Sequence, residues 1–181
     1  MLFKTGKTED AIAAYSQSLK AFPKYHRARA ALGMAEAAVG NTAEAIRLLT
    51  EAQNTVPYPE YAAALADLHR LTGNVTEAER QSKRVDAMIK IARAGGERAN
   101  RVVATIYASE GRNLSEALEL AKAEFEVRND VYSFDALAWC LYKNGKLAEA
   151  QQASEKALQL NTPEPAFWYR GGAIALAAGQ S

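Results

Sequence analysis

The chain has 181 residues, of which 22 are Lys or Arg and 21 are Asp or Glu, giving a net charge of +1. This balance lacks the basic surplus that attracts nucleic acid or an anionic membrane surface, and charged residues interrupt every apolar stretch before the ~18 residues that a membrane span needs. One Cys and two His residues are too few for an internal disulfide or a Cys-based zinc site. Alanine occurs 38 times, and as the strongest helix former it favours an all-helical fold.

Six glycines punctuate the sequence at a nearly constant spacing of 34, 33, 38, 34 and 34 residues. Each of the first five is followed by a short polar segment and then an acidic residue and Ala, as in Gly40-Asn-Thr-Ala-Glu-Ala45. A glycine ends one helix in the left-handed conformation, and an acidic residue suits the first turn of the next helix. A period near 34 with two helices therefore predicts a helical-repeat solenoid. The glycines are Gly6, Gly40, Gly73, Gly111, Gly145 and Gly179.

The period divides the chain into repeats that begin and end in the middle of a helix pair. We therefore expect the sequence to be a fragment of a longer array, with Leu2 and Phe3 closing a first helix that is otherwise missing. The predicted elements in chain order are the second helix of a first repeat at 1–23, a second repeat at 26–57, a third at 59–94 with its second helix extended over 76–94, a fourth at 97–130, a fifth at 131–163, and the first helix of a sixth at 165–179.

The repeats also share residues inside their first helices. Leu32-Gly33 lies shortly before Gly40 in the second repeat, and Gly172 lies at the same distance before Gly179 in the last. Over essentially the whole chain this pattern resembles the tetratricopeptide repeat, or TPR. The resemblance implies a single all-α array over 1–181, a right-handed superhelix of antiparallel helix pairs that acts as a non-enzymatic adaptor for another protein.

In TPR proteins one face of the first helices lines a concave groove that receives a peptide or a helix. With the central glycine as position fifteen, this face consists of positions two, five, nine, twelve and thirteen. Apart from Arg27, it consists of small or apolar residues in the second repeat, but it is aromatic and basic toward the end of the chain. The candidate groove residues are Arg98, Arg101, Tyr132, Asp135, Trp139, Tyr142, Lys143 and Tyr169.

Trp139 is the predicted centre of this groove, with the three tyrosines as its walls and the Arg and Lys residues holding an acidic group or a peptide carboxylate. Aromatic residues and Arg dominate binding hot spots because they bury large, rigid surfaces and still form hydrogen bonds. The alternative is that Trp139 and Tyr169 only pack across adjacent first helices. No repeat has the Lys at position five and Asn at position nine with which one TPR subclass grips chaperone tails.

Sequence features of an enzyme are absent. The chain has no Gly-rich phosphate loop and no His-Glu-x-x-His pair, so we expect no catalytic residue, cofactor or metal. Cys140 is expected to be a buried packing residue rather than a reactive thiol. The expected partner is a protein or peptide, with no nucleic acid and no membrane insertion, and the default location is cytoplasmic. An alternative function is head-to-tail self-association, in which the C-terminal helix of one copy accepts the N-terminal helix of another.

Overall fold

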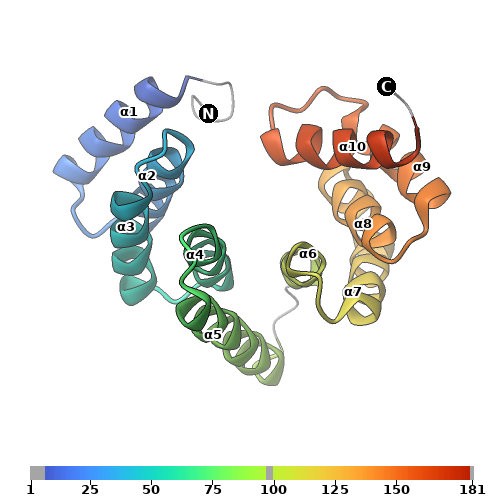
Figure 1. Ribbon diagram of the computed structural model, residues 1–181, viewed down its shortest axis with the longest axis horizontal. Coiled ribbons are helices and arrows are strands. Elements are labelled where there is room, and N and C mark those ends of the chain that lie inside the picture. Colours follow the sequence, from blue (N-terminus) through green and yellow to red (C-terminus); the bar gives the residue numbers. More distant parts are fainter. Residues whose placement is uncertain (1–6, 97–99, 180–181) are drawn as a thin grey trace. The chain divides into compact units, whose positions relative to one another are not determined.

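The structure is a computed structural model that describes residues 7–96 and 100–179. Within these ranges the chain forms ten α-helices and no strand (Figure 1). Leu2, Phe3, Gly6 and the candidate groove residue Arg98 lie outside the described residues. The helices are α1 (Thr8–Ala21), α2 (His26–Ala38), α3 (Thr42–Thr55), α4 (Pro59–Leu71), α5 (Val75–Ala94), α6 (Asn100–Glu110), α7 (Leu114–Val127), α8 (Val131–Lys143), α9 (Leu147–Leu158) and α10 (Pro165–Ala177).

Glycine and proline residues set the ends of the helices. Gly40, two residues beyond the end of α2, has φ +86°, and the next residue, Asn41, donates its backbone N–H to Glu36 O at 2.9 Å. This bond closes the end of the helix around a left-handed residue, which glycine adopts without a side-chain clash. At the other end of a helix, Pro59 and Pro165 occupy the first turns of α4 and α10, where the missing N–H has no partner to lose.

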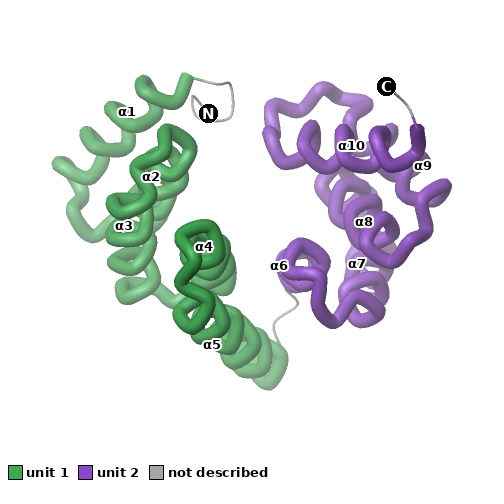
Figure 2. The backbone as a smooth tube through the Cα atoms, in the orientation of Figure 1, with its two compact units in different colours: residues 1–97 green, residues 98–181 purple. Residues whose placement is uncertain are grey.

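The chain divides into two compact units, residues 1–97 (unit 1) and 98–181 (unit 2) (Figure 2). In unit 1, α2 packs against α3 and α4 against α5, and α1 packs against α2. In unit 2, α6 pairs with α7 and α8 with α9, and α10 packs on α9. Two further contacts in unit 2, α6 with α8 and α8 with α10, place the first helices of successive repeats beside one another. This row of helices in unit 2 carries the candidate site.

The cores consist mainly of alanine and branched aliphatic side chains. In unit 1 a buried cluster joins α2, α3 and α4 around Leu49 and Leu65, which are almost fully enclosed. Alanine and glycine allow these helices to approach closely. A Cβ atom on Gly33 of α2 would lie only 3.0 Å from Leu49 Cγ and 3.2 Å from Ala45 O of α3. The glycine in the first helix of a repeat is therefore required by close packing against the second helix.

Two irregular positions in the repeat pattern have local structural causes. Helix α5 spans 20 residues, where the sequence predicts a helix extended over 76–94. Asn113, in the segment after Gly111 that carries one extra residue, adopts φ +49° immediately before α7. Asn tolerates the left-handed region better than most residues, so the extra residue is absorbed in the turn.

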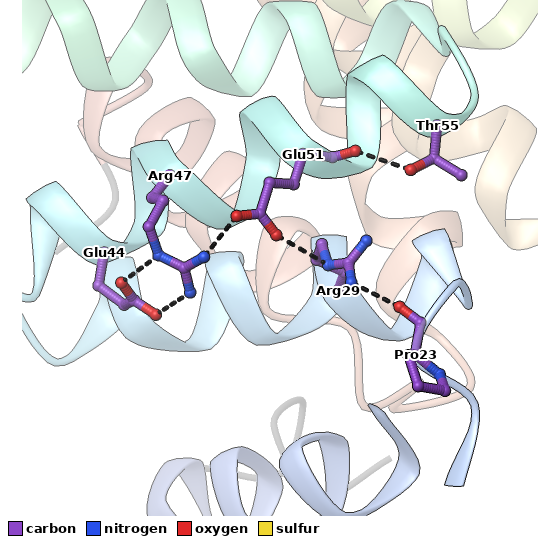
Figure 3. A network of polar contacts seen from close by, with 6 residues as sticks. All are labelled: Pro23, Arg29, Glu44, Arg47, Glu51 and Thr55. Carbon is purple, nitrogen blue, oxygen red and sulfur yellow. Dashed lines mark hydrogen bonds and ion pairs between the residues drawn. The ribbon is translucent and has the colours of Figure 1, made fainter. Parts of the chain in front are cut away.

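Polar contacts tie α2 to α3 across the outside of their pair (Figure 3). Glu51 of α3 binds Arg29 of α2 at 3.2 Å and Arg47 of its own helix at 2.5 Å. Arg47 also donates two hydrogen bonds to Glu44, and these bonds lower the pKa of the Glu44 carboxyl. The charges on α3 are partly solvated, so the ion pairs within that helix add little to its stability, whereas the Arg29 side chain is only 19% exposed.

Candidate binding face

The row of first helices in unit 2 gathers every candidate groove residue that the structure describes. Helix α8 contributes most of them because positions 132, 135, 139, 142 and 143 fall on one side of a helix with 3.6 residues per turn. Helix α6 adds one cation beside them and α10 adds one tyrosine. We call this set the aromatic–cation face. Its members are Arg101, Tyr132, Asp135, Trp139, Tyr142, Lys143 and Tyr169.

Trp139 lies at the base of this face, where the three helices meet. Its side chain is only 5% exposed, and its Nε1–H donates to Ser109 Oγ of α6 at 3.1 Å. The indole ring lies 5.4 Å from the Tyr142 ring and 6.2 Å from the Tyr169 ring of α10, measured between centroids. Trp139 therefore packs across adjacent first helices, and the exposed surface of this face is formed by the residues around it.

Two tyrosines supply the exposed part of the face. Tyr169 is 71% exposed, and Tyr132 is 39% exposed. The Tyr132 ring meets the edge of Phe167 at a centroid distance of 5.3 Å, which links the start of α8 to α10. An aromatic ring that is fixed on one side and open on the other offers contact area at low entropic cost.

The cations of the face lie over aromatic rings. Lys143 Nζ is 5.1 Å from the Trp139 ring centroid, and Arg101 Cζ is 5.5 Å from that of Tyr132. Such positions favour the cation through the quadrupole of the ring. Neither Lys143 nor Arg101 forms an ion pair within the part of the chain that the structure describes, although the Arg101 charge favours the ionised carboxyls of Asp130 and Asp135 nearby.

Asp135 forms a buried ion pair with Arg170 of α10. The Asp135 residue is only 5% exposed. Burial raises the pKa of this carboxyl, and the charge and hydrogen bond of Arg170 oppose that rise. The guanidinium of Arg170 also lies 5.8 Å from the Trp139 ring centroid. The acidic residue of the face is therefore neutralised internally and does not repel an acidic ligand.

Arg170 is the residue that sequence reasoning missed. It lies one position beyond the helix face read from the repeat pattern, beside the predicted Tyr169. A signal was present, because Asp135 falls among apolar residues and a buried carboxylate needs a cation. Arg170 follows it by 35 residues, about one repeat, which is the spacing that places two side chains on neighbouring first helices.

Unit 1 carries an aromatic cluster that the repeat positions also did not predict. His26 Nδ1 lies 3.0 Å from the Tyr61 hydroxyl, and the Tyr58 ring meets that of Tyr61 edge-on at a centroid distance of 5.5 Å. Arg27 lies over Tyr58 at 5.8 Å. Burial is the largest cause that raises the pKa of Tyr61. The cluster sits at the starts of α2 and α4, so it depends on the connectors rather than on the helix faces.

Two features of the described residues bear on metal binding and thiol chemistry. No group of three or more His, Cys, Asp or Glu residues among them is placed to hold a metal ion. Cys140 is buried, and burial raises the pKa of its thiol to about 12, so the reactive thiolate is scarce at neutral pH. Its Sγ lies 3.6 Å from Ala104 O, as a packing residue requires. None of the helices in the described ranges has the length and apolarity to cross a membrane.

The repeat pattern and the helix pairs agree with the matches to known protein families. Two family models, both described as tetratricopeptide repeat, match residues 2–68 and 132–163. The chain is a tetratricopeptide repeat protein. The TPR fold is in general a protein–protein interaction scaffold, and TPR repeats are in general non-enzymatic modules that bind other proteins or peptides. No curated protein matches the sequence.

Solved TPR structures share the fold of this TPR chain at low sequence identity. A chain of the APC/C hetero-tetramer Cut9–Hcn1 is 15% identical with a TM-score of 0.60, and the match covers 98% of this chain and 35% of that one. A tetratricopeptide repeat protein from Parabacteroides merdae is 20% identical with a TM-score of 0.59, covering 99% and 69%. The putative kinesin light chain TPR-like repeats of Podospora anserina (Q17M) are 19% identical with a TM-score of 0.50, covering 99% and 92%. This chain thus spans about a third of the Cut9–Hcn1 chain that it matches.

Proposed function

We propose that the protein is an adaptor that binds a segment of another protein along the aromatic–cation face of unit 2. The segment is acidic, or presents a peptide carboxylate, to Arg101 and Lys143, and lays apolar side chains against Tyr132 and Tyr169. The observation that carries the proposal is the pairing of exposed tyrosines with two cations that form no ion pair among the described residues.

The arrangement under the face supports this role. Trp139 and the Asp135–Arg170 pair hold α6, α8 and α10 together, so the exposed rings are presented on a rigid base and lose little freedom on binding. Arg170 neutralises Asp135 internally, so this carboxylate does not cancel the positive charge of Arg101 and Lys143. Complementary charge of this kind speeds encounter and selects partners by sign.

Selection of peptides from a random library on the immobilised chain tests the proposal. The selected peptides are expected to carry net negative charge. Replacing Tyr169 and Arg101 together by alanine is expected to raise the dissociation constant of the selected peptides by about 30-fold, which corresponds to the loss of a typical hot spot of ~2 kcal/mol. Binding is measured by fluorescence anisotropy at two salt concentrations, because the charged contribution is screened by salt.

Control substitutions of the same chemistry separate binding from folding. Tyr25 is exposed in unit 1 and Lys122 is exposed on α7, so alanine at both positions removes one tyrosine and one cation away from the face. This control is expected to bind as the wild type does. Peptides that bind the Tyr169→Ala, Arg101→Ala variant as tightly as the wild type would reject the face as the binding site.

A further inference from the structure

The turn between α8 and α9 (Figure 1) contains the only asparagine of the chain that precedes a glycine, Asn144-Gly145. The other asparagines precede larger residues, as Asn161 precedes Thr162. Asparagine is one of the thermolabile residues of proteins, because the backbone nitrogen that follows it can attack its side-chain amide. A glycine at the next position leaves this attack sterically open. The turn therefore holds a reactive pair, and the contacts around it determine when the pair can react.

The reaction at this pair consumes one water molecule and releases ammonia. Gly145 N gives its proton to a base in the solvent and bonds to Asn144 Cγ. The Cγ–Nδ2 bond then breaks, and the leaving nitrogen takes a proton from the solvent and departs as ammonia. Water opens the resulting succinimide ring at one of two bonds. Cleavage of the new Cγ–N bond gives aspartate, and cleavage of the original backbone C–N bond gives isoaspartate, whose main chain runs through Cγ.

Two backbone hydrogen bonds hold the reacting atoms apart in the folded turn. Gly145 N–H donates to Tyr142 O at 2.9 Å, and Lys146 N–H donates to Leu141 O at 2.9 Å. Asn144 has φ −92° and ψ 9°, so ring closure requires a large rotation about ψ that turns Gly145 N toward Asn144 Cγ. This rotation breaks both hydrogen bonds. The reaction therefore depends on local opening of the turn, which folded proteins undergo without unfolding as a whole.

The Asn144 side chain is held as firmly as the backbone. Its Nδ2 group donates to Leu114 O, at the first residue of α7, at 2.9 Å and to Cys140 O of α8 at 2.8 Å. Both hydrogens of the amide are thus used, and the residue is half-buried. One side chain joins α8 to the helix pair that precedes it. Opening of the turn must release this contact before the amide can react.

The product cannot restore the contact. An ionised carboxylate accepts hydrogen bonds and donates none, so an oxygen in place of Nδ2 faces the carbonyl oxygens of Leu114 and Cys140 with no hydrogen between them. Isoaspartate also adds a backbone atom to a turn in which Gly145 has φ +75°. Because the ammonia is lost to solvent, the change is permanent.

We propose that Asn144 is a deamidation site that is protected while the α8–α9 turn is folded and reacts when the turn opens. Conversion to aspartate or isoaspartate permanently weakens the attachment of α8 to α7. The modification therefore accumulates with the time that this part of unit 2 spends open, and it acts on the helix that carries most of the aromatic–cation face.

Incubation of the 181-residue chain at mildly alkaline pH, followed by protease digestion and mass spectrometry, tests the proposal. Aspartate and isoaspartate are expected at position 144. Their rate of formation is expected to rise with urea below the unfolding transition and to be at least ~10-fold higher in the unfolded chain, since folding keeps the turn closed most of the time. Asn161 is the matched control, because it is exposed in the same unit and precedes Thr162. Equal rates at Asn144 in the folded and unfolded chains, or faster conversion of Asn161, would overturn the proposal.

Gly145→Ala tests the chemical route in the urea-unfolded chain, where the fold plays no part. The added methyl group hinders ring closure, so conversion of Asn144 is expected to be several-fold slower than in the unfolded wild type. A mixture of aspartate and isoaspartate is the expected product of the ring. Equal rates in the two chains, or aspartate alone, would reject the succinimide route.

Asn144→Asp tests the consequence of the modification, because it places the carboxylate in the turn directly. The ratio of folded to unfolded unit 2 is expected to fall by about 10- to 100-fold, as the loss of two hydrogen bonds predicts. Urea unfolding followed by tryptophan fluorescence measures this ratio, since both tryptophans lie in unit 2. Asn161→Asp adds the same charge at the exposed position and is expected to keep the wild-type midpoint. An Asn144→Asp chain with the wild-type midpoint would show that the modification leaves the attachment of α8 intact.

Discussion

At the scale of single residues, the Asp135–Arg170 ion pair joins α8 to α10 beneath the aromatic–cation face. Asp135 is buried and has Arg170 as its cation, and Arg170 also lies over Trp139. Replacing Arg170 by Met removes the charge and keeps most of the packing volume. We expect this variant to lose about 3–5 kcal/mol of unfolding free energy, because the carboxylate remains buried without a partner.

The double variant separates the ion pair from the packing. Asp135→Leu with Arg170→Met removes both charges, and we expect it to recover most of the loss, since an apolar pair can replace a buried ion pair at little cost. Urea unfolding of the wild type, both single variants and the double variant gives the coupling free energy directly. Additive effects of the two single substitutions would show that the residues act independently and would contradict the assignment.

At the scale of a helix, Asp130 fixes the start of α8, the element that carries most of the face. Its carboxylate accepts the Ser133 N–H at 2.9 Å and the Ser133 hydroxyl at 3.0 Å. Burial raises the pKa of Asp130, but these hydrogen bonds and the nearby Arg101 charge outweigh it and lower the pKa overall. A carboxyl whose pKa is lower in the folded state stabilises the fold fully above its unfolded pKa of about 4. That contribution disappears as pH falls through the lowered value.

We therefore expect Asp130→Ala to reduce the unfolding free energy by about 1 kcal/mol at neutral pH, the usual value of an N-cap. The difference from the wild type is expected to shrink as pH falls through the lowered pKa of Asp130. Asp130→Asn is the matched control, since Asn caps helices about as well as Asp and does not ionise. Thermal unfolding followed by circular dichroism at several pH values measures both. A loss in the alanine variant that stays constant down to the most acidic pH would contradict a role for the ionised carboxylate.

The same helices show how far sequence reasoning reaches. The glycine period predicts the all-α helix pairs, and the structure and the family matches confirm them, because helix ends are set by local residues such as Gly40 and Pro59. The helical spacing in α8 predicts that the candidate residues share one side of the helix, but it does not predict how deeply each side chain is buried. Trp139 lies under the face because Ser109 and Tyr169 come from other helices. Arg170 and the cluster around His26 were missed for the same reason, since their contacts join residues about one repeat apart.

At the scale of the whole molecule, the chain carries two compact units, each with its own core. In a repeat array each element contacts only its neighbours, so the stability is a sum of local contributions. The distribution of tryptophan makes the two units separately observable. Both tryptophans of the chain, Trp139 and Trp168, lie in unit 2. Tryptophan fluorescence therefore reports the unfolding of unit 2, while far-ultraviolet circular dichroism reports both units.

We expect a substitution in the core of unit 1 to leave the fluorescence transition unchanged. Leu65 of α4 is fully buried, and Leu65→Ala is expected to cost about 2–5 kcal/mol through lost contacts and the cavity. That loss moves the part of the circular dichroism transition due to unit 1 to lower urea concentration. The fluorescence midpoint is expected to stay where it is, because unit 1 contains no tryptophan. Ile174→Val, in the buried core of unit 2, is the control and is expected to shift the fluorescence midpoint by the smaller cost of one methyl group, about 1 kcal/mol. Equal shifts of both signals in Leu65→Ala would show that the two units unfold as one cooperative structure.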